Sequence, residues 1–181
     1  MPEWWQSKTP HGITPHLWLS PEATAFMDSI DRPEWNVLEH GAGGSTLWFA
    51  KRCKWVLSIE TDPKWYERLM LMRQEYTKIS IILADKTLSR ELPSMLFGKF
   101  DLMLIDGEPI EDRVEWAANA IKLVKPGGWV CLDNCNRPEF TGAREYLRSI
   151  AEEVKTFDGN MKSESGVQTE YLVTEFYRLK P

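Results

Sequence analysis

The sequence is poor in cysteine and has no amino-terminal signal pattern and no long hydrophobic run. The three cysteines, Cys53, Cys131 and Cys135, form no CxxC spacing. This spacing argues against a disulfide framework or a zinc site and favours a reducing compartment. The start lacks the basic and apolar regions of a secretory signal, and no apolar stretch has the length of a membrane span. We therefore expect a cytoplasmic protein without a membrane partner.

Positive charge is also in short supply. The chain has 22 Lys and Arg against 27 Asp and Glu, a formal net charge of -5. A nucleic-acid groove needs clustered basic residues, so we expect no nucleic-acid partner. With 181 residues, of which 43% are hydrophobic, the chain has the length of one domain and can bury a core without disulfides or metals. We expect residues 1–181 to form a single domain.

Apolar segments that end in polar residues alternate with helical patterns along the chain. The expected strands are residues 36–40, 55–60, 79–84, 100–106 and 129–133. Because they are apolar at nearly every position, they predict a doubly wound α/β fold with a parallel sheet covered on both faces. Two last strands, near 152–158 and 170–178, are joined by too short a segment for a crossover and are expected to be antiparallel. The helix before residue 124 is expected to bury Val114, Ala117, Ala118 and Ile121.

Residues 1–30 are expected to form an amino-terminal segment followed by a first helix. The pair Ser20-Pro21 has the residue types of a helix cap and first turn, and Asp62-Pro63 repeats this signal later. The segment could close over a site as a lid, although aromatic burial favours packing of its tryptophans against the sheet edge. Histidines in such a segment are candidate bases but are more often solvent-facing. The residues concerned are Trp4, Trp5, Trp18, His11 and His16.

The glycine-rich turn after the first strand lacks the third glycine of a dinucleotide fingerprint, because position 46 is Thr46. Gly41 and Gly43 would let the backbone approach a ligand, and Ser45 and Thr46 offer hydroxyl groups at the start of a helix. Glu39 stands directly before the turn. Its carboxylate would repel a pyrophosphate and attract a cation. The pattern therefore favours a positively charged nucleoside over NAD.

Each later strand also ends in an acidic or amide residue. Because ligands bind outside the carboxyl ends of parallel strands, these side chains are expected to meet at one edge of the sheet. Glu60, about 20 residues after the turn, suits the two hydroxyl groups of a ribose. The candidate cofactor-binding residues beyond the turn are Glu60, Thr61, Asp85, Lys86 and Asp106, and Asp133 and Asn134 end the next strand.

Four motifs together resemble class I S-adenosylmethionine-dependent methyltransferases. They are Glu-x-Gly-x-Gly at 39–43, the acid at 60, Phe-Asp-Leu-Met-Leu-Ile-Asp-Gly at 100–107 and Leu-Val-Lys-Pro-Gly-Gly-Trp-Val at 123–130. The resemblance covers about residues 36–135 and implies a Rossmann-like, seven-stranded sheet, mostly parallel with an antiparallel last strand. It also implies S-adenosylmethionine as cofactor, with the methionine part at Gly41 and Gly43, the ribose at Glu60 and the adenine amino group at Asp85. Residues 44–50 and 58–65 are similar to a small-molecule branch of the superfamily.

Asp106 with Asp133 and Asn134 also resembles the catechol-type O-methyltransferases, in which these positions hold a magnesium ion. Such a cation takes oxygen ligands and lowers the pKa of a bound hydroxyl group, which creates a nucleophile. The catalytic lysine of that pattern is replaced by Pro109. The alternative is that Asp106 orients substrate or a loop, while the other two side chains make turn hydrogen bonds. Two basic residues remain as substitutes for the lysine, Lys86 and Arg113.

The expected function is transfer of a methyl group from S-adenosylmethionine to oxygen or nitrogen of a small-molecule acceptor. The candidate catalytic residues are Asp106, Asp133 and Asn134. Two alternatives remain open: an aminopropyltransferase-like enzyme using the same crevice, and a non-catalytic scaffold that binds the cofactor. The tryptophan-rich start is also compatible with a homodimer.

Overall fold

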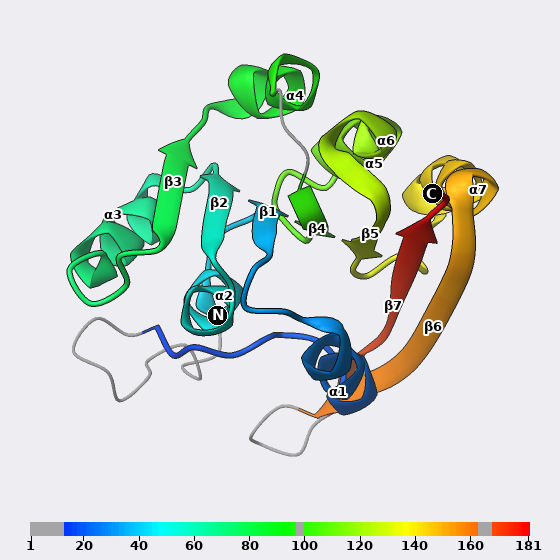
Figure 1. Cartoon of the computed structure of the whole chain (residues 1–181), viewed down its shortest axis with the longest axis horizontal. Helices are drawn as coiled ribbons and strands as arrows, with labels where there is room; N and C mark the ends of the chain where they lie inside the picture. Colours follow the sequence, from blue (N-terminus) through cyan, green and yellow to red (C-terminus); the bar gives the residue numbers. More distant parts are fainter. Residues whose placement is uncertain (1–12, 97–99, 163–167) are drawn as a thin grey trace.

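The computed structural model describes residues 13–96, 100–162 and 168–181, and it places seven strands in one sheet (Figure 1). The strands are β1 (Asn36–His40), β2 (Trp55–Glu60), β3 (Ile79–Leu83), β4 (Phe100–Ile105), β5 (Val124–Leu132), β6 (Ala151–Lys162) and β7 (Gln168–Leu179). Their order is β3-β2-β1-β4-β5-β7-β6, and only β7 runs antiparallel to its neighbours. The Rossmann-like α/β prediction is confirmed, including the antiparallel last strand.

Helices cover both faces of the sheet (Figure 1). One face carries α1 (Pro21–Ile30), α2 (Gly44–Arg52) and α3 (Pro63–Met72). The other carries α4 (Lys86–Met95), α5 (Asp112–Ala118), α6 (Ala120–Leu123), the short 3-10 helix η2 (Pro138–Phe140) and α7 (Thr141–Ile150). Within the described parts of the chain, no helix combines the length and hydrophobicity that crossing a bilayer requires.

The strands divide their side chains between two cores. Val37 on β1 packs with α1, α2 and α3, whereas its neighbour Leu38 packs in the core under α5 and α7. On β5, Trp129 and Val130 alternate in the same way. The three cysteines are free and buried within these cores. Because successive side chains of a strand point to opposite faces, covering both faces explains why the strands are apolar at nearly every position.

The caps at the starts of α1 and α3 form as predicted. The Ser20 hydroxyl accepts a hydrogen bond from the Ala23 amide at 3.2 Å. The Asp62 carboxylate accepts one from the Lys64 amide at 2.7 Å, and Pro63 follows in the first turn. Both helices therefore begin where the sequence predicts, which places Asp62 at the edge where β2 ends.

The predicted buried stripe of the α5 region is confirmed at Ala117 and wrong at Val114, Ala118 and Ile121. Val114 and Ile121 are 38% and 52% exposed, and the helix breaks at Asn119 into α5 and α6. The buried positions instead follow the spacing i, i+3, i+4 and i+7. They are Arg113, Trp116, Ala117 and Ala120. The first residue of this stripe is Arg113, and a prediction from hydrophobic periodicity places an arginine on the surface.

A buried carboxylate, Glu175 on β7, ties the antiparallel end of the sheet to α7. It accepts hydrogen bonds from Arg144 Nε at 3.2 Å and from Arg148 Nη2 at 2.6 Å. The Tyr177 hydroxyl also donates to it. Burial alone raises the pKa of Glu175, but the hydrogen bonds from Arg144, Tyr177 and Arg148 outweigh burial and lower this pKa to about 2.

We predict that Glu175→Gln destabilises the protein in a pH-dependent way. Because the folded pKa lies below the unfolded value, the stabilising contribution is complete above the unfolded pKa and is lost as the pH falls toward about 2. At pH 7 the variant should lose about 3 kcal/mol of unfolding free energy, as expected when one partner of a buried ion pair is removed. Urea unfolding checks this, with the exposed Glu67→Gln as control. A gap to wild type that does not narrow between neutral pH and the acid range would contradict it.

Candidate active site

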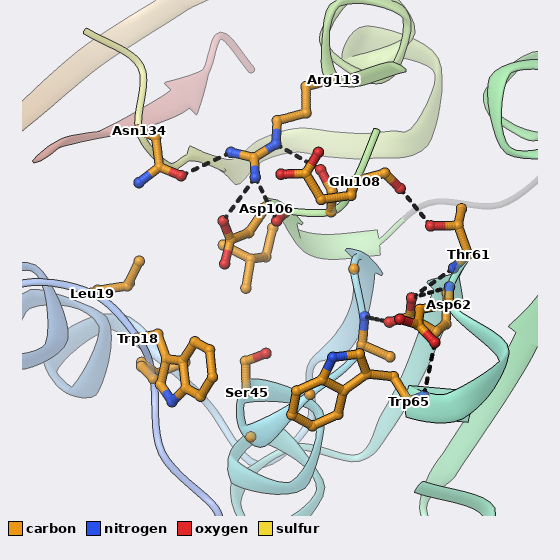
Figure 2. A pocket seen from close by; sticks show the side chains of 18 residues that line it. Trp18, Leu19, Ser45, Thr61, Asp62, Trp65, Asp106, Glu108, Arg113 and Asn134 are labelled. Carbon is orange, nitrogen blue, oxygen red and sulfur yellow. Dashed lines mark hydrogen bonds and ion pairs between the residues drawn. The ribbon is translucent and has the colours of Figure 1, made fainter. Parts of the chain in front are cut away.

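A cavity of about 400 Å³ opens at the carboxyl edge of the sheet (Figure 2). Its walls come from residues 17–19, the glycine turn after β1, the ends of β2 and β4, the first turn of α5 and the residue Asn134 after β5. β1 lies between β2 and β4, which is the point where the strand order reverses. Open α/β sheets bind their ligands at this switch point.

Glu39 lies beneath the glycine turn and is fully buried. Its Oε2 atom accepts hydrogen bonds from the hydroxyls of Thr46 at 2.5 Å and Ser58 at 2.6 Å, and Oε1 accepts one from the Ser45 hydroxyl. Thr46 in turn accepts the Gly43 amide at 2.9 Å. Burial raises the pKa of Glu39 to about 7, although the three hydroxyl groups favour its charged form. Glu39 and Thr46 thus support the turn from behind, while Ser45 and Gly43 line the cavity.

Two glycines bring the turns after β1 and β4 into direct backbone contact. Gly41 has a φ of +93°, and a Cβ atom added there would lie 2.4 Å from the Gly107 Cα atom. Gly43 differs, because its backbone is extended and an added Cβ would meet no other atom within 4 Å. Gly41 is therefore required for the close approach, and Gly43 leaves open space at the cavity wall.

Glu60 ends β2 and lines the cavity. Its Oε1 atom accepts the amides of Thr61 and Asp62 at 2.7 Å each, and its Oε2 atom accepts the Ala42 amide at 2.9 Å. Burial raises the pKa of Glu60 against these backbone hydrogen bonds. A carboxylate offers about four lone pairs, so these three bonds leave acceptor capacity for a ligand.

The loops after β2 and β4 are joined across the cavity edge. The Thr61 hydroxyl donates to the Glu108 carbonyl oxygen at 2.6 Å (Figure 2). Both residues line the cavity. This bond therefore ties the two loops together at the cavity wall.

Arg113 of α5 is the centre of the opposite wall and is only 3% exposed. Its Nε atom donates to the Gly107 carbonyl at 2.8 Å, and Nη2 donates to the Asp106 carbonyl at 2.7 Å. Nη2 also lies 3.2 Å from the Asp106 carboxylate atom Oδ1. Nη1 donates to the Asp133 carbonyl at 3.1 Å and to Asn134 Oδ1 at 3.2 Å (Figure 2). One side chain thus holds the loops after β4 and β5 together.

Asp106 and Asp133 differ in how they lie relative to the cavity. The side chain of Asp106 is 31% exposed and lines the cavity, as does that of Asn134, whose φ is +53°. Asp133 lies behind the wall, is 3% exposed and accepts a hydrogen bond from the Thr174 hydroxyl on β7. Burial raises the pKa of Asp106, the neighbouring Asp133 raises it further, and Arg113 opposes the rise. Burial also raises the pKa of Asp133.

Four sequence-predicted cofactor residues do not line this cavity: Glu39 and Thr46, which lie behind the glycine turn, and Asp85 and Lys86, which follow β3. Asp85 is exposed and caps α4 by accepting the Leu88 amide at 2.8 Å. Lys86 lines a second cavity of about 450 Å³, shared by α4 and α5. The sequence places Asp85 and Lys86 at the correct sheet edge, but neither lines the first cavity.

The amino-terminal segment crosses the glycine turn and forms part of the wall. A Cβ atom at Gly44 would lie 2.6 Å from the Thr14 carbonyl oxygen, so the two segments touch. His16 is exposed, lies outside the cavity wall and hydrogen-bonds Thr14 at 2.9 Å. The other candidates in this segment lie outside the described residues: Trp4, Trp5 and His11.

Two tryptophans, Trp18 and Trp65, line the cavity. Trp18 lines the wall instead of the sheet edge, and its ring meets Trp65 of α3 edge-on at 6.4 Å. Figure 2 shows both rings on the side of the cavity opposite Asp106 and Arg113. Trp65 directly follows the capped start of α3 after β2, and this position beside a strand end is the only sequence signal for it. Nothing in the sequence distinguishes Trp18 from a packing residue.

The three residues predicted to hold magnesium have other partners in this structure. In the described ranges, no group of three His, Cys, Asp or Glu side chains is arranged to hold a metal ion. Asp133 directs a carboxylate oxygen to Thr174, and the guanidinium of Arg113 already contacts the side-chain oxygens of Asp106 and Asn134. The three side chains expected as ligands therefore do not fit magnesium.

Comparison with known proteins gives a family and a shared fold. A family model described as a methyltransferase domain matches residues 38–135, more than half of the chain. No protein of curated function matches the sequence.

Several solved structures resemble this one. Precorrin 8W decarboxylase from Methanobacterium thermoautotrophicum is 17% identical, with a TM-score of 0.71 and 96% of each chain covered. An O-methyltransferase from Bacillus cereus, in complex with SAH, is 20% identical, with a TM-score of 0.65 and coverage of 90% of this chain and 82% of that one. An rRNA methylase from Streptococcus thermophilus is 13% identical, with a TM-score of 0.65 and coverage of 91% and 100%. At such identities the likeness shows the fold alone.

We predict that Gly41→Ala destabilises the protein and that Gly43→Ala does not. The first substitution combines a left-handed backbone with a collision against Gly107 and should cost about 1–3 kcal/mol of unfolding free energy. The second adds a methyl group to open space on an extended backbone and should change stability by less than about 0.5 kcal/mol. Urea unfolding of both variants beside wild type is the measurement. Equal stability of the two variants would refute the assigned backbone contact.

Proposed function

The chain belongs to the class I S-adenosylmethionine-dependent methyltransferases, and on this premise we propose that it methylates an oxygen or nitrogen atom of a small-molecule acceptor in the described cavity. The observation that carries the proposal is the arrangement of the glycine turn and of Glu60 around one cavity at the switch point of the sheet. The acidic residues that line the cavity favour binding of a cationic ligand.

The charge of the cavity wall suits a sulfonium. Four carboxylates line it among the described residues, and Arg113 is the one basic residue beside them. Arg113 already uses its N–H groups on protein oxygens. Apart from Asp106, whose partner is Arg113, these acids face no basic residue of the cavity wall, so a positive ligand is attracted and a pyrophosphate is repelled. The acids are Glu60, Asp62, Asp106 and Glu108.

The residues present fit S-adenosylmethionine. Gly43 leaves a space at the wall that a Cβ atom would fill, so the turn can receive the methionine part of the cofactor. Glu60 retains acceptor capacity for ribose hydroxyls. We place the adenine toward Thr61 and, past its link to Glu108, toward Asp85 and Lys86. Such a placement requires the Thr61 hydroxyl to release the Glu108 carbonyl.

The chain's own contribution to methyl transfer is alignment and exclusion of water. The bound cofactor would supply a methyl group that its sulfonium already activates. The protein must hold the acceptor atom in line with that group, which removes most of the entropic cost. Asp106 faces the cavity, so we assign it to orienting the acceptor or accepting its proton. Asn134 lines the same wall and assists in orientation, and Asp133 supports both from behind.

The size and lining of the cavity support a small acceptor. Its volume of about 400 Å³ lies low in the range of roughly 300–1,000 Å³ typical of small-molecule sites. Leu17, Trp18 and Leu19 supply an apolar wall from the amino-terminal segment. The acidic lining opposes binding of a phosphate backbone.

We predict that the folded protein binds S-adenosylmethionine and not NAD⁺ in isothermal titration. Glu60→Gln should weaken binding about 10- to 100-fold, because it removes a charge-assisted hydrogen bond to the ribose. Glu67→Gln, an exposed substitution on the neighbouring helix α3, is the matched control and should bind like wild type. Thermal unfolding of each variant separates lost binding from lost structure. Failure of folded wild type to bind the cofactor at high micromolar concentration would rule out the proposal.

We also predict turnover with a subset of small hydroxyl- or amine-bearing compounds. A mass-spectrometric screen detects a mass gain of one methylene unit in the acceptor and the demethylated cofactor as co-product. Transfer of an aminopropyl group from the decarboxylated cofactor would reassign the reaction. Cofactor binding without turnover over a broad acceptor panel would indicate a scaffold instead of an enzyme.

A further inference from the structure

The guanidinium of Arg113 lies between the two cavity-lining groups that a magnesium ion would need. Nη2 is 3.2 Å from Asp106 Oδ1, and Nη1 is 3.2 Å from Asn134 Oδ1 (Figure 2). We propose that Arg113 is a permanent internal cation that takes the place of a divalent metal and positions Asp106 and Asn134 for the acceptor. The inference rests on the proposed methyl transfer and assigns a positioning residue to it.

Arg113 makes four hydrogen bonds and one ion pair. A guanidinium has five N–H donors in a rigid planar fork. Here five oxygen contacts match them: the carbonyls of three residues and the side-chain oxygens of two. A buried charge is tolerated only when it is paired and hydrogen-bonded, and this network meets that condition. Arg113 is therefore fixed in place by both loops and has no cause to leave the wall.

A divalent ion would compete with this arrangement at a disadvantage. It would have to take the oxygens of Asp106 and Asn134 from Arg113, and it would stand beside an unscreened positive charge. Asp133 offers no compensation, because it lies behind the wall and accepts the Thr174 hydroxyl. Two of the side-chain oxygens that the sequence suggests as metal ligands, those of Asp106 and Asn134, thus hold the guanidinium of Arg113.

The arrangement has a consequence for the acceptor. Asn134 accepts from Arg113 through its carbonyl oxygen, which leaves its amide N–H groups as the donors it can offer. Asp106 has one oxygen on Arg113 and a partly exposed side chain, so its second oxygen can receive a proton or a hydrogen bond. The acceptor therefore meets an amide donor and a carboxylate acceptor, both held at fixed positions by Arg113.

Manganese titration followed by electron paramagnetic resonance tests this assignment without any acceptor. The samples are wild type, Arg113→Lys, Arg113→Ala, Asp106→Asn and Arg113→Ala combined with Asp106→Asn. The lysine variant keeps the charge and loses the fork, and the alanine variant removes the charge and opens space between the oxygens. Arg144→Ala is the control, because it removes an arginine from another internal carboxylate pair, that of Glu175. Titration with the demethylated cofactor in the same samples reports on the cofactor site separately.

We expect wild type, the lysine variant and the Arg144 control to bind no stoichiometric Mn²⁺. Arg113→Ala should bind Mn²⁺ about 10- to 100-fold more tightly than wild type, the range by which groups around a metal alter its affinity. The double variant should lose this gain. A wild-type Mn²⁺ site that Asp106→Asn abolishes would overturn the proposal, as would a folded Arg113→Ala protein without improved Mn²⁺ binding. If Arg113→Ala does not fold, the wild-type and lysine titrations decide. Loss of cofactor binding in wild type contradicts the proposed function instead.

Discussion

The constraint on which this site depends is the burial of a full positive charge at Arg113. A guanidinium removed from water must find an acceptor for each of its donors. The loops after β4 and β5 supply these acceptors, and they can do so only because the two strands are neighbours that end at the same edge. The same requirement sets the rotation of α5, turning Val114 to the surface. The shape of these two loops and the position of Asp106 thus depend on satisfying one side chain.

The opposite side of the cavity is organised by a carboxylate. Glu39 lies under the glycine turn and accepts hydrogen bonds from three hydroxyl groups. These bonds stabilise its carboxylate although it is buried from solvent. Gly41 and Gly107 allow the turns after β1 and β4 to come into direct contact. The cavity is therefore preorganised, with acids under and around the turn and a neutralised arginine in the facing wall. Such a site suits a compact cation better than an extended anion.

The chain pattern predicts the sheet well because local physics suffices for it. Strands apolar on both faces require helices on both faces, and the caps at Ser20 and Asp62 start their helices as the residue types indicate. The α5 phase is missed because hydrophobic periodicity treats Arg113 as a surface residue. Trp18 is missed because an irregular segment has no period from which its direction could be inferred. Asp85 and Lys86 are placed at the correct edge but not in the first cavity.

By itself, the sequence determined which strands exist, their parallel arrangement and the gathering of acidic side chains at one edge, because strand period and chain direction are local properties. It also carried the methyltransferase motifs. Only the tertiary structure decided which of those acids face the cavity and which lie behind it. It also decided that the guanidinium of Arg113 joins Asp106 to Asn134. The reason is that hydrogen-bond partners come from loops distant in the chain, and their distances are set by packing that no single segment encodes.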